Sequence, residues 1–410
     1  MMEVVYPRCC GLDLHKKRVV ACLIVPGADG APQKEVRTFG TMTDQLLSLA
    51  DWLAAAGCTH VAMESTGVYW KPVYNLLEGI FELLLVNARH MKAVPGRKTD
   101  VKDCEWIAEL LRHGLLQASF VPDRPQRELR ELTRYRTALI QARSAEINRL
   151  QKTLEGANIK LASVATDIMG TSGRQMLAAL VEGTTDGAVL AQLAKGRLRE
   201  KLPALEQALT GRMGAHQRFL LARQLAHITF LDEQIEQLSA EIVERLHPFQ
   251  EMIDRLDTIP GVGRRVAEVV VAEIGTDLTR FPTAGHLASW AGMCPGNNES
   301  AGRRKSGATR KGSPWLRMAL IEAAQAAART RNTYLMAQYR RLAARRGRKK
   351  ALVAVGHSIL VIAYYLLTRQ TNYQELGGQY FDERDRQAVE RRLVRRLEAL
   401  GYKVSLDPAA

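Results

Sequence analysis

The chain has 410 residues and a formal net charge of +15, a length that predicts two or three domains with ample core. Its six cysteines include no CxxC pair, no signal-peptide segment follows Met1, and the most apolar stretch, residues 351–367, is short and interrupted by polar residues. The sequence therefore predicts neither a cysteine-based zinc site nor a secreted or membrane protein, and a reducing cytoplasm is the expected compartment.

The first domain, residues 1–122, carries a regular alternation of elements. The sequence predicts strands at 9–15, 18–25 and 36–40, a helix at 43–56, a strand at 60–64, a helix at 69–77 and a strand at 81–86. Three strands followed by helix, strand, helix, strand predict a mixed α/β sheet of the RNase H-like kind. In such sheets ligands bind at strand ends.

Four carboxylates fall at positions that this fold would bring together. Asp13 lies near the end of the first strand, Glu64 ends the fourth, and Asp100 and Asp103 open the next helix. Residues three apart share a helix face, so both aspartates are expected to point at one spot. Ligands that are all oxygen favour Mg²⁺, with Mn²⁺ as the alternative, and two such ions ~3.5–4 Å apart would assist phosphoryl transfer.

Each acid also has an ordinary structural explanation. Asp13 and Glu64 are acceptable turn residues at strand ends, and Asp100 with Asp103 would suit the N-terminus of any helix, where the helix dipole favours negative charge. The coincidence of all four in one fold pattern is the reason for preferring a metal site.

The second region, residues 123–248, is helical and carries no catalytic motif. Helices are predicted at about 128–154 and 216–246. The second of these has a heptad repeat formed by Leu221, Ile228, Ile235 and Ile242. Two interpretations remain open: a coiled coil within or between protomers, or an antiparallel hairpin of these two helices inside one chain.

Residues 249–350 form the third predicted region, mainly α-helical, and 351–410 the C-terminal helices and tail. The third region opens with a helix-hairpin-helix signature around Gly261 and Gly263. Glycines there would let backbone N–H groups approach a DNA phosphate, and Arg264 and Arg265 add charge. The alternative is a hairpin that serves packing alone.

A glycine-rich, basic loop at residues 294–312 is the second chemical focus. Its prolines and glycines predict irregular structure. It contains Ser300 and Ser306, and Ser313 follows it; the residues alone do not choose among these serines. Its five basic residues are Arg303, Arg304, Lys305, Arg310 and Lys311.

Most of the positive charge is concentrated in one stretch. Residues 303–350 contain fifteen Lys or Arg residues and a single acid, Glu322. A charge run is usually a solvated surface, but this one is concentrated enough to favour neutralisation of nucleic-acid phosphates.

Several motifs together resemble one known family. Residues 11–16 (GLDLHK), 63–67 (MESTG) and 98–103 (KTDVKD) are similar to motifs of insertion-sequence transposases with a RuvC-like DEDD domain. Residues 259–263 (IPGVG) and 294–302 (CPGNNESAG) resemble the C-terminal, serine-bearing transposase domain of the same family, the bridge-RNA-guided recombinases. The resemblance covers nearly the whole chain.

The resemblance implies a chemistry and partners. A serine in this loop attacks the DNA phosphate, and Ser300 matches it; Glu299 stands where the commoner family string has another serine. Arg303, Arg304 and Lys305 would hold phosphate. The family also implies a homodimer or tetramer with a composite site between protomers, donor and target DNA, a structured noncoding bridge RNA, and a place at the bacterial nucleoid.

Three hypotheses follow from these observations. The first is a serine-plus-metal transposase or recombinase, and the second is a RuvC-like structure-specific endonuclease that uses metal-activated water. The third is a DNA-binding protein with an inactive RNase H-like domain. The presence of all four acids argues against the third, and the basic serine loop argues against the second.

Overall fold

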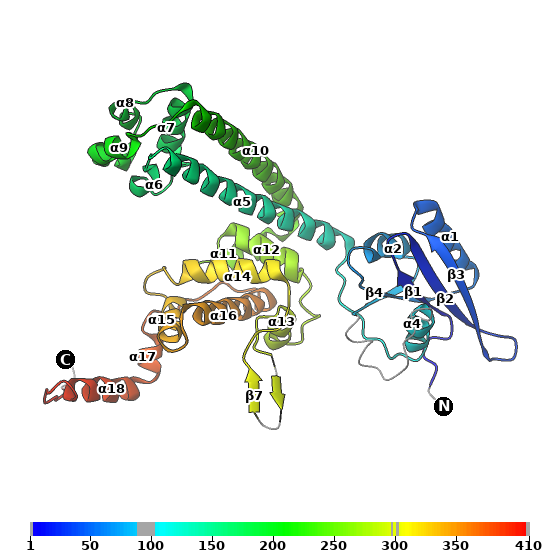
Figure 1. The fold of residues 1–410 in the computed structure, drawn as a ribbon. Coiled ribbons are helices and arrows are strands. Elements are labelled where there is room, and N and C mark those ends of the chain that lie inside the picture. Colours follow the sequence, from blue (N-terminus) through cyan, green and yellow to red (C-terminus); the bar gives the residue numbers. More distant parts are fainter. Residues whose placement is uncertain (1–2, 88–102, 297, 301–302, 407–410) are drawn as a thin grey trace. The chain divides into compact units, whose positions relative to one another are not determined.

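The structure is a computed structural model that describes residues 3–87, 103–296, 298–300 and 303–406. The chain divides into two compact units, Met1–Pro122 and Asp123–Ala410. Figure 1 shows the helices and strands of both units, most of them labelled.

The first unit is built on a single mixed sheet. Its elements are β1 (Cys9–Leu14), β2 (Arg18–Pro26), β3 (Pro32–Gly40), α1 (Thr43–Ala55), β4 (His60–Glu64), α2 (Trp70–Leu77), β5 (Glu82–Val86) and α4 (Asp103–Arg112). The strand order is β3-β2-β1-β4-β5, with β1 antiparallel to β2 and parallel to β4. The predicted α/β sheet domain is confirmed, and its assignment to the RNase H-like fold stays a prediction.

The centre of this sheet is buried on both faces. In β1, Cys9, Cys10 and Leu12 are fully buried, as expected for a strand that reads as a continuous apolar run. One face packs against α1 and α2 around Leu12 and Met63. The opposite face, which carries Cys9, is covered by α4. By contrast, most of β3 is exposed at the sheet edge.

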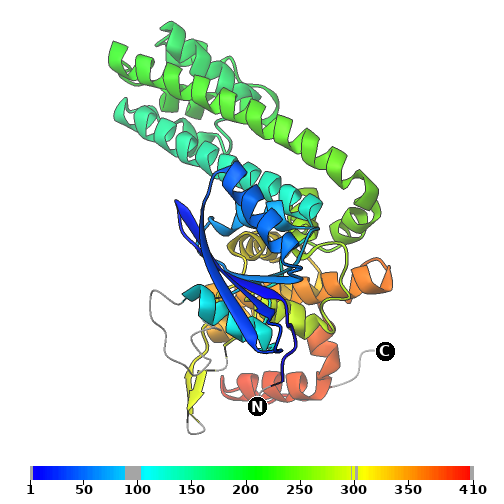
Figure 2. The ribbon, with the colours of Figure 1, turned by 90° about the vertical axis from the view of Figure 1, so that its right-hand side faces the viewer.

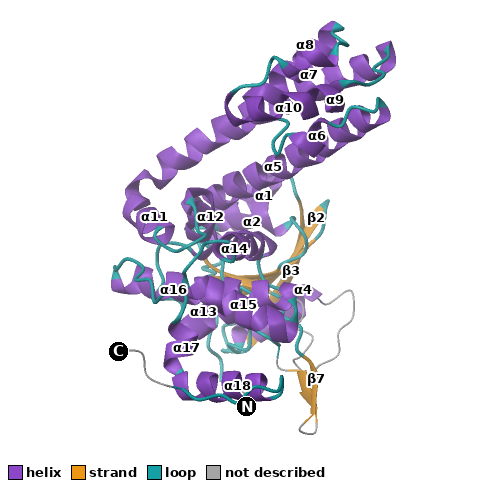
Figure 3. Cartoon of the chain, turned by 90° about the vertical axis from the view of Figure 1, so that its left-hand side faces the viewer, coloured by secondary structure: helices purple, strands orange, loops and turns teal. Residues whose placement is uncertain are grey.

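The second unit is largely helical (Figure 3). Its first part contains α5 (Arg124–Gly156), α6 (Leu161–Val164), α7 (Thr171–Glu182), α8 (Gly187–Ala191), η2 (Gly196–Lys201), α9 (Leu202–Leu209) and α10 (Ala215–Leu246). The remainder contains η3 (His247–Phe249), α11 (Gln250–Asp257), α12 (Arg264–Ile274), α13 (Ala284–Trp290), β6 (Asn298–Ser300), β7 (Arg303–Ser306), α14 (Pro314–Ala327), α15 (Tyr334–Arg346), α16 (Arg348–Arg369), α17 (Tyr380–Arg384) and α18 (Arg386–Glu398).

Helices α5 and α10 lie side by side and run in opposite directions (Figures 1 and 2). Arg143 of α5 pairs with Asp232 of α10, and Glu128, at the start of α5, pairs with Arg245, near the end of α10, at 3.1 Å. The four heptad residues predicted for the second helix are buried: Leu221, Ile228, Ile235 and Ile242. Of the two interpretations left open by the sequence, the structure shows the antiparallel pairing within one chain.

Helix α5 begins earlier than its apolar pattern predicts. The Asp123 side chain accepts a hydrogen bond from the backbone N–H of Gln126 at 3.1 Å, and Pro125 occupies the first turn. An N-cap of this kind contributes about 1 kcal/mol, and proline is well suited to a first turn because its missing N–H needs no partner there.

Helices α11 to α16 share the main core of the second unit. Among the residues that the structure describes, α16 alone is long and apolar enough to cross a membrane, judged by length and composition. It packs on α13, α14 and α15, and Val355, Ile359 and Leu360 are buried in that core. Core helices of this kind pass the same test of length and composition.

Candidate active site and nucleic-acid interface

Asp13 and Glu64 lie at the ends of two neighbouring parallel strands. Leu12 of β1 is in register with Met63 of β4, so the next residue of each strand is one of the two acids. Side chains alternate between faces along a strand. Since Leu12 and Met63 contact α1 and α2, both acids belong to the opposite face, where they are half-buried.

Helix α4 covers the face that carries these acids. A Cβ added at Gly11 would lie 2.3 Å from the carbonyl oxygen of Cys104 and 2.4 Å from the backbone nitrogen of Ala108, so α4 touches the backbone of β1. Burial raises the pKa of the Cys104 thiol, and the negative charge of Asp13 raises it further. Asp103, the first residue of α4, is therefore close to the end of β1.

The structure thus places Asp13 and Glu64 on one face of the sheet, with Asp103 at the start of the helix that covers that face. Asp100 lies outside the described residues. Within the described ranges, no three His, Cys, Asp or Glu side chains form a group that could hold a metal ion. The donors on this face are carboxylate oxygens, which fit Mg²⁺ or Mn²⁺ by chemistry. A metal site built from all four acids stays a prediction.

His15 is a neighbour of this site to which sequence reasoning gave no role. Its Nε2 lies 3.0 Å from Oδ2 of Asp13, and its side chain is exposed. The contact could have been predicted from the sequence, because His15 follows Asp13 by two residues, just beyond the strand end.

The loop that carries Ser300 is more regular than predicted. Strands β6 and β7 pair as an antiparallel hairpin, in which Ser300 is opposite Arg303. The pairing continues at the base, where Pro295 bridges Thr309 and the N–H of Gly296 donates to the carbonyl of Ala308 at 2.9 Å. The prediction of irregular structure was wrong because the prolines and glycines flank or separate the two strands and leave their backbone groups free to pair.

The turn between α11 and α12 uses its glycines differently from the prediction. Gly261 has φ +87°, and a Cβ there would lie 2.4 Å from backbone atoms of α14, so this glycine serves close packing. Gly263 has nothing within 4 Å of that position and precedes the first turn of α12. Contact of this turn with DNA phosphate stays a prediction, and packing accounts for Gly261.

The predicted phosphate-binding arginines and lysines differ in their surroundings. Arg264 is engaged within the chain, donating to Glu268 at 3.1 Å and to Gln250 at 2.9 Å. Arg265, which like Arg264 is exposed, lies in the first turn of α12. In the serine loop Arg303, Arg310 and Lys311 are exposed; the side chains of Arg304 and Lys305 lie outside the described part of the structure.

A second basic surface, the α15–α16 corner, falls within the basic stretch 303–350 that the sequence singled out as a whole. It lies where α15 ends and α16 begins, around Gly347. Its exposed cations are Arg340, Arg341, Arg345, Arg346, Arg348, Lys349 and Lys350. The density of charge in residues 303–350 was the signal for it, and only the helix boundaries show that these seven cations share a corner.

A buried ionic network between α5 and α12 was also missed. Glu268 pairs with Arg136 at 2.7 Å, and Glu273 pairs with Arg134 at 2.7 Å. Both glutamates are buried. The sequence feature that could have indicated this network is the pair of acids in the otherwise apolar run of α12, because buried acids need cationic partners.

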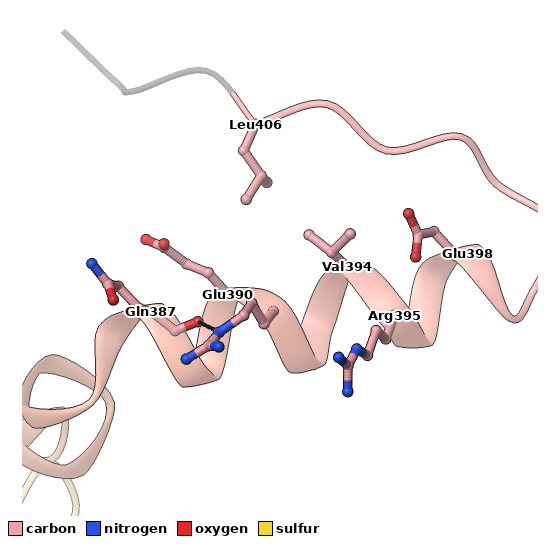
Figure 4. Close-up of a pocket in the computed structure, with 7 residues that line it drawn as sticks. Gln387, Glu390, Val394, Arg395, Glu398 and Leu406 are labelled. Atoms are coloured by element: carbon pink, nitrogen blue, oxygen red, sulfur yellow. Dashed lines mark hydrogen bonds between the residues drawn. The ribbon is translucent and has the colours of Figure 1, made fainter.

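The C-terminal helix α18 forms a shallow groove with the tail that follows it. Figure 4 shows Leu406 of the tail above the side chains of Glu390 and Val394. No residue of α18 is buried. The groove contains none of the candidate acids or serines, and we assign it no chemistry.

Comparison with known proteins gives two family matches. Residues 10–159 match a domain model described as Transposase, of the DEDD type of IS110 elements, and residues 253–340 match the model described as Transposase IS116/IS110/IS902 family. The first match contains the sheet with the acids, and the second contains α12 and the serine hairpin.

Individual relatives agree with this. The chain is 31% identical over 258 residues to an uncharacterised protein of insertion element IS116 from Streptomyces clavuligerus, covering 55% of this chain and 62% of that protein. It is 24% identical to the transposase for insertion sequence element IS1111A of Coxiella burnetii, covering 71% and 72%. It is 27% identical to a probable family 20 transposase of Pseudomonas aeruginosa, covering 77% and 85%.

Both domains of one transposase type are therefore present in the expected order, each over elements that the structure describes. The chain belongs to the IS110/IS116 family of transposases.

Proposed function

We propose that this chain cuts and rejoins DNA during movement of an insertion sequence, using Ser300 as the nucleophile together with a metal site of Asp13, Glu64, Asp100 and Asp103. The observation that supports the proposal is that Asp13 and Glu64 lie on adjacent strands, on the face of the sheet that α4 covers, in a chain of a transposase family. Acids collected in this way serve phosphoryl transfer in metal-dependent enzymes.

The proposed reaction exchanges one phosphoester for another. The Ser300 hydroxyl oxygen bonds to phosphorus, one sugar oxygen leaves, and the proton lost by the serine is taken up by a neighbouring base and returned to the leaving oxygen. The phosphoester bond is kept in a protein–DNA linkage, so a second DNA end can displace the serine and complete the joining without an external energy source.

The metal would be Mg²⁺, with Mn²⁺ as the alternative, held by the four carboxylates. When bound, such an ion neutralises charge on the phosphate and on the departing oxygen. The chain's own contribution is to place Asp13 and Glu64 on adjacent strands and to keep α4 against them. His15, at 3.0 Å from Asp13, orients that carboxylate.

Basic surfaces of the second unit support DNA as the substrate. The hairpin presents Arg303, and Arg310 and Lys311 are exposed near its base. The α15–α16 corner adds seven exposed cations. Such cations bind the phosphate backbone of any sequence and release counterions, so sequence selection has to come from elsewhere.

A structured noncoding bridge RNA is the proposed source of that selection, and it would pair with donor and target DNA. We further propose that the working form is a homodimer or tetramer, in which acids and serine act on the same phosphate from different protomers. The motif resemblance supports both proposals.

Trapping of the covalent intermediate tests the proposal. Wild type, Ser300→Ala and the matched control Ser306→Ala are incubated with labelled element-end DNA, the element's noncoding RNA and Mg²⁺, and are then denatured. We expect a protein–DNA adduct with wild type and with Ser306→Ala, and none with Ser300→Ala, which still binds DNA.

The same denatured samples, analysed by gel electrophoresis, also test the alternative in which water is the nucleophile. Cleavage by Ser300→Ala at the wild-type rate, without any adduct, would show that water is the nucleophile. The chain would then be a RuvC-like structure-specific endonuclease that uses the acids alone.

A further inference from the structure

Glu273, near the end of α12, is a buried carboxylate that the proposed reaction does not use. Its side chain is 1% exposed. Arg134 of α5 forms two bonds with it, Nε to Oε1 at 2.7 Å and Nη2 to Oε2 at 2.9 Å. Arg130, also on α5, lies 3.9 Å from Oε2. A buried charge needs such partners. Because both arginines belong to α5, this carboxylate joins α12 to that long helix.

A further contact leads from the same carboxylate to the serine hairpin. The Ser313 hydroxyl donates to Oε2 of Glu273 at 3.0 Å. Ser313 is also the N-cap of α14, where its oxygen accepts from the backbone N–H of Leu316 at 3.3 Å. Since α14 starts where the hairpin loop ends, Glu273 fixes one end of that loop.

The two ends of the loop are locked together next to Ser313. A Cβ at Gly312 would lie 2.2 Å from the carbonyl oxygen of Ala291, so the two backbone segments touch. Arg317 reinforces this junction by donating to the carbonyl of Gly292 at 3.2 Å and to the Thr309 hydroxyl at 2.6 Å. A shift of Ser313 is therefore transmitted to both strands of the hairpin.

We propose that Glu273 is a positioning residue that fixes the base of the serine hairpin to α5 and so sets the direction in which Ser300 meets the DNA. The inference rests on the proposed role of Ser300 as nucleophile. Glu273 is not in contact with the reacting atoms; it acts through Ser313.

Glu268 provides a matched control on the same helix. It is equally buried and pairs with Arg136 of α5 at 2.7 Å. It also pairs with Arg264, which lies on its own helix and not in the hairpin loop. Loss of charge at either position removes a buried link between α12 and α5, but only Glu273 also holds the hairpin.

The experiment compares Glu273→Gln with Glu268→Gln in the full chain. We expect similar losses of thermal stability in the two variants. Adduct formation should fall by about 10- to 100-fold in Glu273→Gln alone, since a displacement of about 1 Å costs that much in an oriented reaction. DNA binding should stay within about twofold of wild type in both, because no phosphate-binding cation is removed.

Hydrogen exchange supplies a readout that does not depend on the nucleophile. The Gly296 amide, bonded to Ala308 at the hairpin base, should exchange faster in Glu273→Gln than in Glu268→Gln or wild type. Equal exchange in all three proteins would overturn the positioning role. If Ser300→Ala still cleaves, the proposed nucleophile is wrong, and the exchange comparison still decides whether Glu273 holds the hairpin.

Ser313 gives a second route if Glu273→Gln does not fold. Ser313→Thr keeps the hydroxyl and should keep adduct formation within about threefold of wild type. Ser313→Asp keeps a good N-cap but replaces the donor by a second carboxylate, and it should slow adduct formation as much as Glu273→Gln does. Equal rates in the two Ser313 variants would overturn the proposal.

Discussion

The candidate acids and the candidate serine are held in place by different means. Asp13 and Glu64 lie at or next to the ends of two parallel strands, and the residues that precede them, Leu12 and Met63, are fully buried. Ser300 ends a strand of three residues in a hairpin, and its described anchoring contacts lie at the hairpin base. The acids are thus positioned by an apolar core, and the serine by a few polar contacts.

This difference has a consequence for variants. Close packing transmits any change in volume, so a substitution under the acids should affect stability and chemistry together. A hairpin fixed at its base can lose its alignment while the unit remains folded. The two regions are therefore expected to respond differently to equivalent changes.

The largest expected effect is on the chemistry at the acids. Asp13→Asn removes a charge without changing shape, so cleavage and joining should fall on the order of a thousandfold or more if the carboxylate holds a metal ion. The measurement is strand transfer in Mg²⁺, with DNA binding measured in parallel. Asp51→Asn, at an exposed position on α1, is the control and should leave strand transfer unchanged.

A mixture of variants sharpens this result. If the acids and the serine of one active site come from different protomers, some mixed oligomers of the two single variants contain an intact site. A mixture of Asp13→Asn protein and Ser300→Ala protein should then recover a substantial fraction of wild-type joining. A mixture as inactive as its components would contradict the composite site.

An added methyl group should destabilise the region around the acids more than the serine hairpin, because the two regions differ in how closely they are packed. Gly11→Ala places a Cβ 2.3 Å from the Cys104 carbonyl oxygen, so it should cost about 1–3 kcal/mol and displace α4 with Asp103. Gly307→Ala, just after β7, meets nothing within 4 Å and should change stability by less than about 0.5 kcal/mol. Urea unfolding measures the stability of both variants. Equal losses of stability would argue against close packing of α4 on β1.

The last expected difference has no effect at neutral pH: it is a dependence of stability on alkaline pH that is confined to the first unit. Burial raises the pKa of Cys9, Cys22 and Cys58 from 9.0 to about 12. These thiols stay protonated in the folded unit but ionise in the unfolded chain near pH 9. Stability should therefore be unaffected below that pH and fall above it, by about 1.4 kcal/mol per pH unit for each thiol.

Urea unfolding between pH 8 and pH 11 measures this slope. A Cys22→Ala, Cys58→Ala double variant should show a shallower fall than wild type, while the second unit, with Cys294 as its single cysteine, should not differ between the two proteins. Identical slopes for the first unit would show that the thiols do not contribute.

Much of the fold followed from local patterns. The apolar run that contains Leu12 predicted a strand, and the heptad of Leu221, Ile228 and Ile235 predicted the buried face of α10. The strand-end positions of Asp13 and Glu64 could likewise be predicted. Such features can be predicted from sequence because the spacing of apolar residues and the type of side chain indicate which face of a helix or strand is buried.

The mixed sheet, the long helices, the acids near the strand ends and the family could thus all be predicted from sequence. Tertiary structure decided that Gly261 packs on α14, that Ser300 ends a paired strand, and that Glu273 joins α5 to the hairpin base. Glu273 and Arg134 are 139 positions apart in the chain, and no local periodicity records such a partner. Only the folded chain brings these groups together.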